Sequence, residues 1–183
     1  YDWGIVDPND PDKYLAAPGG QDEMLPERYA EAYHDLRELI LDADATARVA
    51  IGGVIQPTPL RLDYLDIVWD TYQDLYTDTL PTAAWNIHNM ILREYDCEYF
   101  GYDPNQCFGA DVPPGVPPPP NGYGAAYSIQ DADDVDIFED QIYAFRQWMA
   151  SKGETNKPLI VSEFSVLYGD VPGTLDYDLA RVR

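Results

Sequence analysis

Three apolar segments, each preceded by a helix-periodic segment, constrain the fold of this chain more than any other feature. The apolar segments are residues 48–56, 84–90 and 157–164. Strands that alternate with helices predict a parallel sheet, joined by right-handed crossovers and covered by the helices. In the helical segments, apolar and aromatic residues recur at spacings of three and four, which is typical of amphipathic helices. These positions are Tyr29, Tyr33, Leu36, Ile40 and Ala43, then Leu62, Leu65, Trp69, Tyr72 and Tyr76, and finally Val135, Phe138, Ile142, Phe145 and Met149.

The last apolar segment ends on a carboxylate, Glu163, after a start at Lys157-Pro158. In an α/β barrel the catalytic groups lie at the carboxyl ends of the strands, so Glu163 is a candidate catalytic residue. The alternative is that Glu163 is only the first polar residue after the strand and points into solvent. The period of two predicts that Leu159, Val161 and Glu163 share one face and that Ile160, Ser162 and Phe164 share the other.

Polar side chains also interrupt the middle apolar segment, residues 84–90. Asn86 and His88 are expected on one face of this strand, and Trp85 and Ile87 on the other. A histidine here is either a core residue whose ring bonds to backbone groups or a functional neighbour of Glu163. The nearby carboxylate favours the functional interpretation, in which Asn86, His88 and Glu163 open on the same side of the sheet.

Residues 49–62, 85–88 and 157–164 together resemble the second half of a retaining glycoside hydrolase of the large clan A type, a (β/α)8 barrel. The resemblance extends over about residues 24–168. It implies that Glu163, at the end of strand seven, is the nucleophile, and that Asn86 and His88 on strand six contact the substrate. Gln56 and Tyr127 are the other substrate-binding candidates. The acid/base of this clan is a Glu that follows an Asn on strand four, and no Asn-Glu pair occurs in this sequence.

The missing pair and the chain length predict an incomplete barrel. A whole barrel of this kind takes roughly 250 residues, whereas this chain has 183 residues and three recognisable strands. We therefore expect residues 1–183 to be one partial barrel domain covering strands five to seven. An open sheet has unpaired edges, so we also expect the remainder of the same polypeptide, or another chain, to complete it.

The charge balance restricts the partners. Eleven basic residues against 33 acidic residues give a formal net charge of −22, which repels nucleic acid and anionic lipid. The sequence contains no apolar run of the roughly 20 residues that cross a membrane.

The Asp-rich segment 7–12 departs from calcium-loop spacing and predicts a solvated turn. No metal or cofactor is predicted, and a carbohydrate is the expected partner.

A long insertion at about residues 93–130 follows the strand that carries His88. It contains a proline-rich run and many aromatic residues, including Tyr127, of which one or two are expected to face a sugar and the rest to pack together. Cys97 and Cys107 are either joined as a disulfide or two free thiols. The disulfide is the preferred interpretation, and it predicts an extracellular or cell-surface location.

Two functions are compatible with the sequence. The first is a retaining glycoside hydrolase acting on a β-linked glycan, in which a nucleophile and an acid/base stand about 5–5.5 Å apart. Glu94 is the fallback acid/base, although its place next to Arg93 suits a structural salt bridge better. The second is a non-catalytic carbohydrate-binding or structural extracellular domain on the same scaffold.

Overall fold

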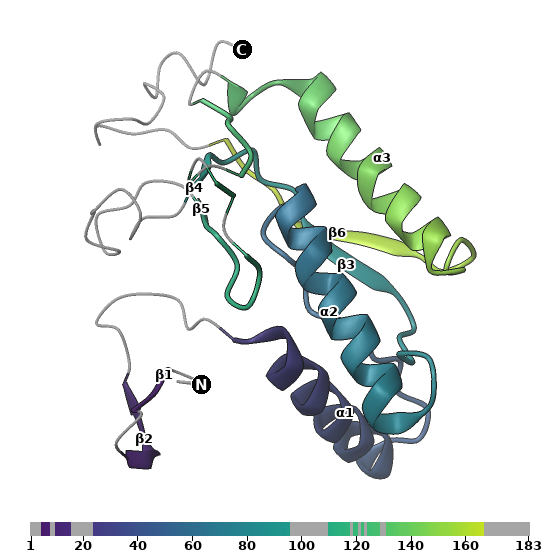
Figure 1. Cartoon of the computed structure of the whole chain (residues 1–183). Coiled ribbons are helices and arrows are strands. Elements are labelled where there is room, and N and C mark those ends of the chain that lie inside the picture. The colour runs from purple at the N-terminus through teal and green to yellow at the C-terminus, as the bar shows by residue number, and fades with distance from the viewer. Residues whose placement is uncertain are drawn as a thin grey trace.

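The computed structural model describes residues 5–7, 10–15, 24–95, 110–117, 119–120, 122, 124–128 and 131–166, and these form a mixed α/β structure (Figure 1). The helices are α1 (Pro26–Ala43), α2 (Pro59–Tyr76) and α3 (Val135–Ser151). They agree with the three helical segments expected from the sequence. The strands are β1 (Ile5–Asp7), β2 (Asp10–Leu15), β3 (Trp85–His88), β4 (Glu94–Tyr95), β5 (Ala110–Asp111) and β6 (Leu159–Glu163).

Local sequence signals explain where the helices begin. Pro26 and Pro59 stand in the first turn of α1 and α2, where the missing N–H costs nothing because it has no intrahelical partner. Asp134 caps α3, and its carboxylate accepts the backbone N–H groups of Asp136 at 2.9 Å and Ile137 at 3.2 Å. These signals act locally, because each stands within the first turn of its own helix or directly before it.

The central sheet is parallel, and its segments lie in chain order. β3 pairs in parallel with β6. Residues 49–55 lie along the other edge of β3, although only one bridge, between Val54 and Ile87, is regular. Backbone bonds from Ala83 N–H to the Val49 carbonyl and from His88 N–H to the Val54 carbonyl, each 2.8 Å long, hold this segment in place. The first expected strand is therefore an irregular extended segment.

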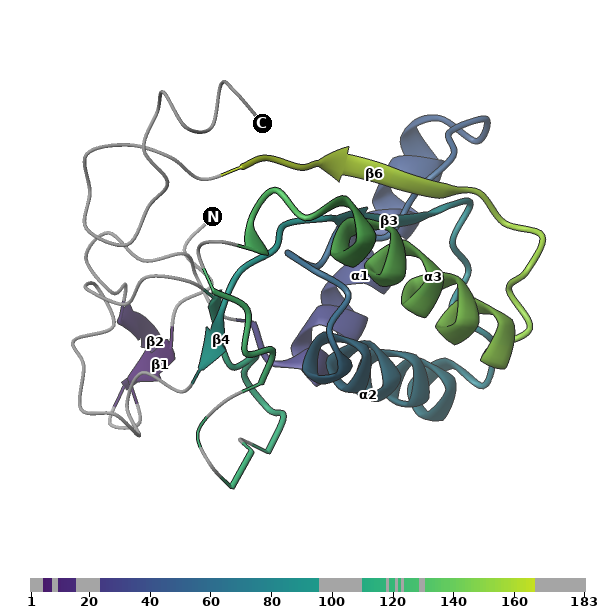
Figure 2. The ribbon, with the colours of Figure 1, turned by 90° about the horizontal axis from the view of Figure 1, so that it is seen from above.

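The connections through α2 and α3 place both helices on the same side of β3 (Figure 2). Trp85 and Ile87, which are 1% and 0% exposed, point to this side. The Trp85 ring lies edge-on to Trp148, with centroids 4.8 Å apart, and 6.1 Å from the ring of Phe145. Burial of these large rings stabilises the packing of α3 on the sheet, since each ring removes roughly 150–250 Å² from water.

The opposite side of β3 carries the polar residues Asn86 and His88, which are partly exposed. The alternation predicted for this strand is confirmed: Trp85 and Ile87 are buried, and the two residues between and after them are not. The sheet thus has one face packed on helices and one open polar face.

The long insertion contains a short parallel pair that the sequence did not predict, between β4 and β5. Cys97 and Cys107 lie outside the described residues. Near the N-terminus, β1 and β2 pair antiparallel, with Asp7 opposite Asp10. Residues 10–12 belong to strand β2, so the turn expected over residues 7–12 does not extend over them. Of the helices in the described ranges, none combines the length and apolar character needed to cross a membrane.

Candidate functional site

His88 and Glu163 meet at the carboxyl ends of two neighbouring parallel strands, β3 and β6. The His88 Nε2 atom lies 3.6 Å from the Glu163 Oε1 atom. Their side chains are 26% and 59% exposed, so the pair stands at the rim of the open face with access to solvent. The expectation that these two residues come from adjacent parallel strands and open on the same side is confirmed.

An irregularity in β6 brings Glu163 to this face. Ile87 pairs with Val161, but His88 pairs with Glu163, so Ser162 is an extra residue in β6. A bulge of this kind reverses the side on which the following side chains point. The expectation that Glu163 shares a face with Leu159 and Val161 is therefore wrong.

Ring packing beyond the bulge agrees with this change of phase. Leu159 and Val161 pack against the core on the helix side. Phe164, one residue beyond Glu163, contacts Phe138 at the start of α3, with ring centroids 5.9 Å apart. The period of two therefore resumes beyond the bulge in the opposite phase.

Asn86 and Gly53 form the floor of the same corner. A Cβ atom added to Gly53 would lie 2.9 Å from His88 Cδ2 and 3.1 Å from Asn86 Nδ2, so both side chains lie directly against the glycine backbone. The Asn86 Oδ1 atom is buried and finds no hydrogen-bond partner among the described residues. A buried amide oxygen without a donor costs about 1–3 kcal/mol, which a hydroxyl donor from a ligand or a water molecule would recover.

This corner combines groups that can act on a polar ligand. Glu163 offers a carboxylate that is accessible rather than consumed by a buried ion pair. His88 is close enough to approach hydrogen-bond distance after a small movement, and it forms an ion pair with Glu163 only when its ring is protonated. The arrangement suits a nucleophile or base with an adjacent ring that orients it.

The other predicted substrate-binding residues lie elsewhere. Gln56 is fully buried, and its side-chain amide is bonded at both ends to the backbone of Leu92, at 3.1 and 2.9 Å. Tyr127 is half-buried in the insertion, and its carbonyl accepts the Arg93 Nε–H at 3.3 Å. Gln56 thus joins two connecting segments, and both ends of its amide are bonded to the Leu92 backbone.

Glu94 is fully buried in a polar cluster of its own. Its Oε1 atom accepts Arg61 Nε–H at 2.8 Å and the Thr58 hydroxyl at 3.0 Å, and its Oε2 atom accepts the Ala125 N–H at 3.3 Å. The expectation of a structural salt bridge is confirmed, but the partner is Arg61 on α2 rather than the adjacent Arg93. With both oxygens bonded, Glu94 is poorly placed to serve as an acid/base.

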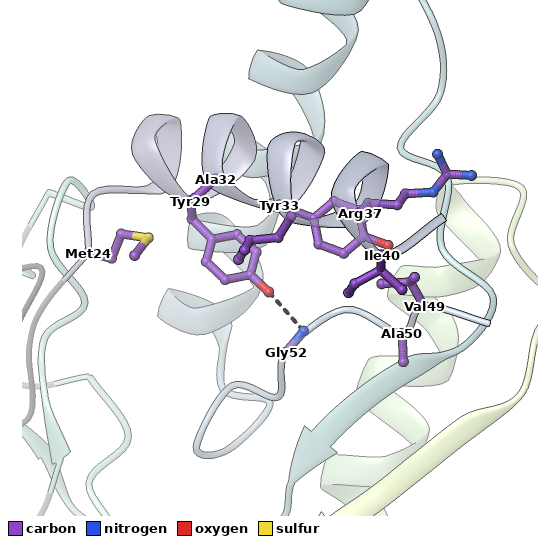
Figure 3. A pocket seen from close by; sticks show the side chains of 10 residues that line it. Met24, Tyr29, Ala32, Tyr33, Arg37, Ile40, Val49, Ala50 and Gly52 are labelled. Atoms are coloured by element: carbon purple, nitrogen blue, oxygen red, sulfur yellow. Dashed lines mark hydrogen bonds between the residues drawn. The ribbon is translucent and has the colours of Figure 1, made fainter. Parts of the chain in front are cut away.

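A separate apolar pocket of about 260 Å³ lies between α1 and residues 49–52 (Figure 3). The Tyr29 hydroxyl accepts the Gly52 N–H at 2.8 Å across this pocket, and burial raises the pKa of Tyr29 to about 12. Leu36 and Ile40 remain 56% and 42% exposed at its rim. Among the described residues that line it there is no carboxylate, so these residues do not offer the acid/base chemistry of the corner at Glu163.

Gly53 is the residue of this corner that was not singled out from the sequence. Its signal was the Gly52-Gly53 pair inside an apolar segment, since glycine within a strand often marks an irregularity or a close approach of another chain segment.

Within the described ranges, no group of three or more His, Cys, Asp or Glu residues could hold a metal ion. Comparisons with protein-family models, with curated proteins and with solved structures find no match.

Proposed function

We propose that this chain contributes the nucleophile of a retaining glycoside hydrolase that acts on a β-linked glycan. Glu163 is the nucleophile, and Asn86 and His88 contact the sugar or the nucleophile. The observation that carries the proposal is the meeting of Glu163 and His88, 3.6 Å apart, at the carboxyl ends of adjacent parallel strands. Active sites of α/β barrels are built at this end of the sheet.

The proposal includes the finer fold assignment, namely that 49–55, β3 and β6 are three consecutive strands of a (β/α)8 barrel. Support comes from their parallel order and from the position of α2 and α3 on one side of β3 (Figure 2). The open polar face would then line the interior of the barrel. The strands that close the barrel come, in this proposal, from the remainder of the polypeptide or from another chain.

The reaction would proceed by double displacement. The ionised Glu163 carboxylate attacks the anomeric carbon while an acid protonates the leaving oxygen, and water then hydrolyses the glycosyl ester with net retention. Glu94 does not fit the acid/base role, because it is buried and bonded to Arg61 and Thr58. The acid/base is therefore assigned to a carboxyl group outside this chain, and an extracellular or cell-surface location fits a glycan substrate.

The test is covalent trapping of the nucleophile. The polypeptide that carries this chain is incubated with a panel of activated 2-deoxy-2-fluoro-β-glycosides, which slow hydrolysis of the ester, and its peptides are analysed by mass. We expect a glycosyl adduct on the peptide containing Glu163. Glu163→Gln should abolish the adduct and lower hydrolysis by about 10³-fold or more with the fold retained, since the amide cannot form the ester. An adduct on another residue, or a fully active Glu163→Gln variant, would refute the assignment.

A second candidate is a carbohydrate-binding or structural domain without catalysis. It is favoured by one observation: the second carboxylate that the sequence offered, Glu94, is committed to a buried salt bridge. Titration of the wild-type protein and Glu163→Gln with oligosaccharides separates the two functions. Binding by both proteins, without hydrolysis by either, would establish the binding domain.

A further inference from the structure

We infer that Gly53 is a positioning residue that fixes the orientation of the His88 ring toward Glu163. The inference deepens the proposed function, because it concerns the same corner. Gly53 lies on the segment that flanks β3 on one side, and Glu163 lies on the strand that flanks it on the other. The His88 side chain, on β3 between them, therefore lies between Gly53 on one side and Glu163 on the other.

The contact at Gly53 leaves no room for a side chain. An added Cβ atom would lie 2.9 Å from His88 Cδ2, a separation that a carbon atom essentially never adopts, and 3.2 Å from the His88 backbone nitrogen. The interior of a protein is packed too closely for such an overlap to be absorbed without a shift. The ring is the part that can rotate, so an alanine at position 53 would turn the imidazole away from its present place.

The distance to Glu163 makes this rotation consequential. At 3.6 Å, the gap between Nε2 and Oε1 is slightly longer than a hydrogen bond. A movement of the His88 ring by a few tenths of an ångström therefore decides whether the two groups interact. Gly53 acts through His88, because the atom nearest to an added Cβ at position 53 belongs to the His88 ring. The two glycines of this segment differ in this respect, because a Cβ on Gly52 would instead meet the Tyr29 hydroxyl, at 2.9 Å.

Only two histidines occur in the sequence, which allows a direct spectroscopic test. The imidazole resonances of His88 and His34 are recorded by two-dimensional NMR in the full chain and assigned with His34→Asn. His34 is the internal reference, since its ring stacks on Tyr76 with centroids 3.7 Å apart and its Nδ1 atom lies 2.9 Å from the Tyr72 hydroxyl. The measured quantity is the change in the His88 resonances caused by Glu163→Gln, first in the wild-type background and then in Gly53→Ala.

We expect Glu163→Gln to shift the His88 resonances in the wild-type background and to shift them by less than about half as much in Gly53→Ala, because the two changes are coupled through one ring. The control Gly52→Ala should leave the effect of Glu163→Gln on His88 unchanged, and His34 should not respond to Glu163→Gln in any background. An equal response of His88 in wild type and in Gly53→Ala would overturn the inference. Absence of hydrolysis by the wild-type protein would overturn the proposed function but not this result.

Should Gly53→Ala fail to fold, Gly53→Ala/His88→Ala provides the second measurement. Recovery of the folded state in the double variant would show that the overlap is with the His88 ring. A double variant that is as unfolded as the single one would place the obstruction at the backbone or at Asn86 and would overturn the inference.

Discussion

The His88 ring and the Glu163 carboxylate face each other across two parallel strands because Ser162 is an extra residue in β6. The extra residue shifts the register, so that His88 pairs with Glu163 and Glu163 lies on the open side of the sheet rather than on the helix-covered side. The side-chain atoms of the pair approach to 3.6 Å. Bulges of this type often aim a side chain next to a functional site.

The first prediction concerns the neighbour of the nucleophile. If hydrolysis is detected, His88→Asn is expected to lower kcat/KM by about 10–100-fold, since it removes one oriented polar group beside the reacting carboxylate. Stability should change little, because the ring is partly exposed. The matched control is His34→Asn, which changes the α1–α2 contact and should leave kcat/KM unaltered. Equal rates for wild type and His88→Asn would contradict the role given to His88.

The second prediction concerns the buried carboxylate. Glu94→Ala removes the partner of Arg61 and the acceptor of the Thr58 hydroxyl, and it should lower the free energy of unfolding by about 3 kcal/mol. Denaturant unfolding monitored by tryptophan fluorescence measures the loss. The exposed pair Arg28–Glu31 is the control, and Glu31→Ala should cost less than about 1 kcal/mol. Similar losses in both variants would show that the buried pair has no special weight.

The third prediction separates a structural from a ligand-binding role for Gln56. Gln56→Ala leaves the backbone N–H and carbonyl of Leu92 without their partners, which should lower the free energy of unfolding by about 1–3 kcal/mol. The exposed Gln147 on α3 is the control, and Gln147→Ala should be nearly neutral. A Gln56→Ala variant with wild-type stability but weaker oligosaccharide binding would restore Gln56 to the substrate site.

The fourth prediction concerns alkaline pH. Burial raises the pKa of Tyr29 to about 12 and also raises the pKa values of Tyr33 and Tyr64 above the ordinary value of 10.0. Above pH 10 the unfolded chain releases phenolic protons that the folded chain retains, so unfolding becomes more favourable. The free energy of unfolding should not depend on these groups below about pH 10 and should fall as the pH rises from there toward 12.

Urea unfolding at a series of pH values measures this dependence. The variant Tyr29→Phe/Tyr64→Phe should show a shallower fall above pH 10, although its stability at neutral pH will also be lower because the Tyr29 bond to Gly52 is lost. The slope is therefore the quantity to compare. An equally steep fall in this variant would assign the alkaline transition to other groups.

Local sequence determined the elements and their order. Pro26 and Pro59 set the starts of α1 and α2, Asp134 set the start of α3, and the spacing of apolar residues set their lengths. These signals act between residues a few positions apart, so they can be read without knowledge of the partners. The alternation of helices with apolar segments predicted the α/β class, and the rule for crossover connections predicted the parallel pairing of neighbouring strands such as β3 and β6.

The tertiary structure decided how Glu163 reaches the site and which other polar side chains are kept away from it. The side on which Glu163 lies depends on the register of β6 against β3, and the period of two within β6 cannot reveal an extra residue at Ser162. The structural roles of Gln56 and Glu94 could not be read from the sequence, because their partners, Leu92 and Arg61, are 36 and 33 residues away in sequence. Such contacts arise only when distant segments pack, because burial removes water as the alternative partner and each polar group must then find one within the fold.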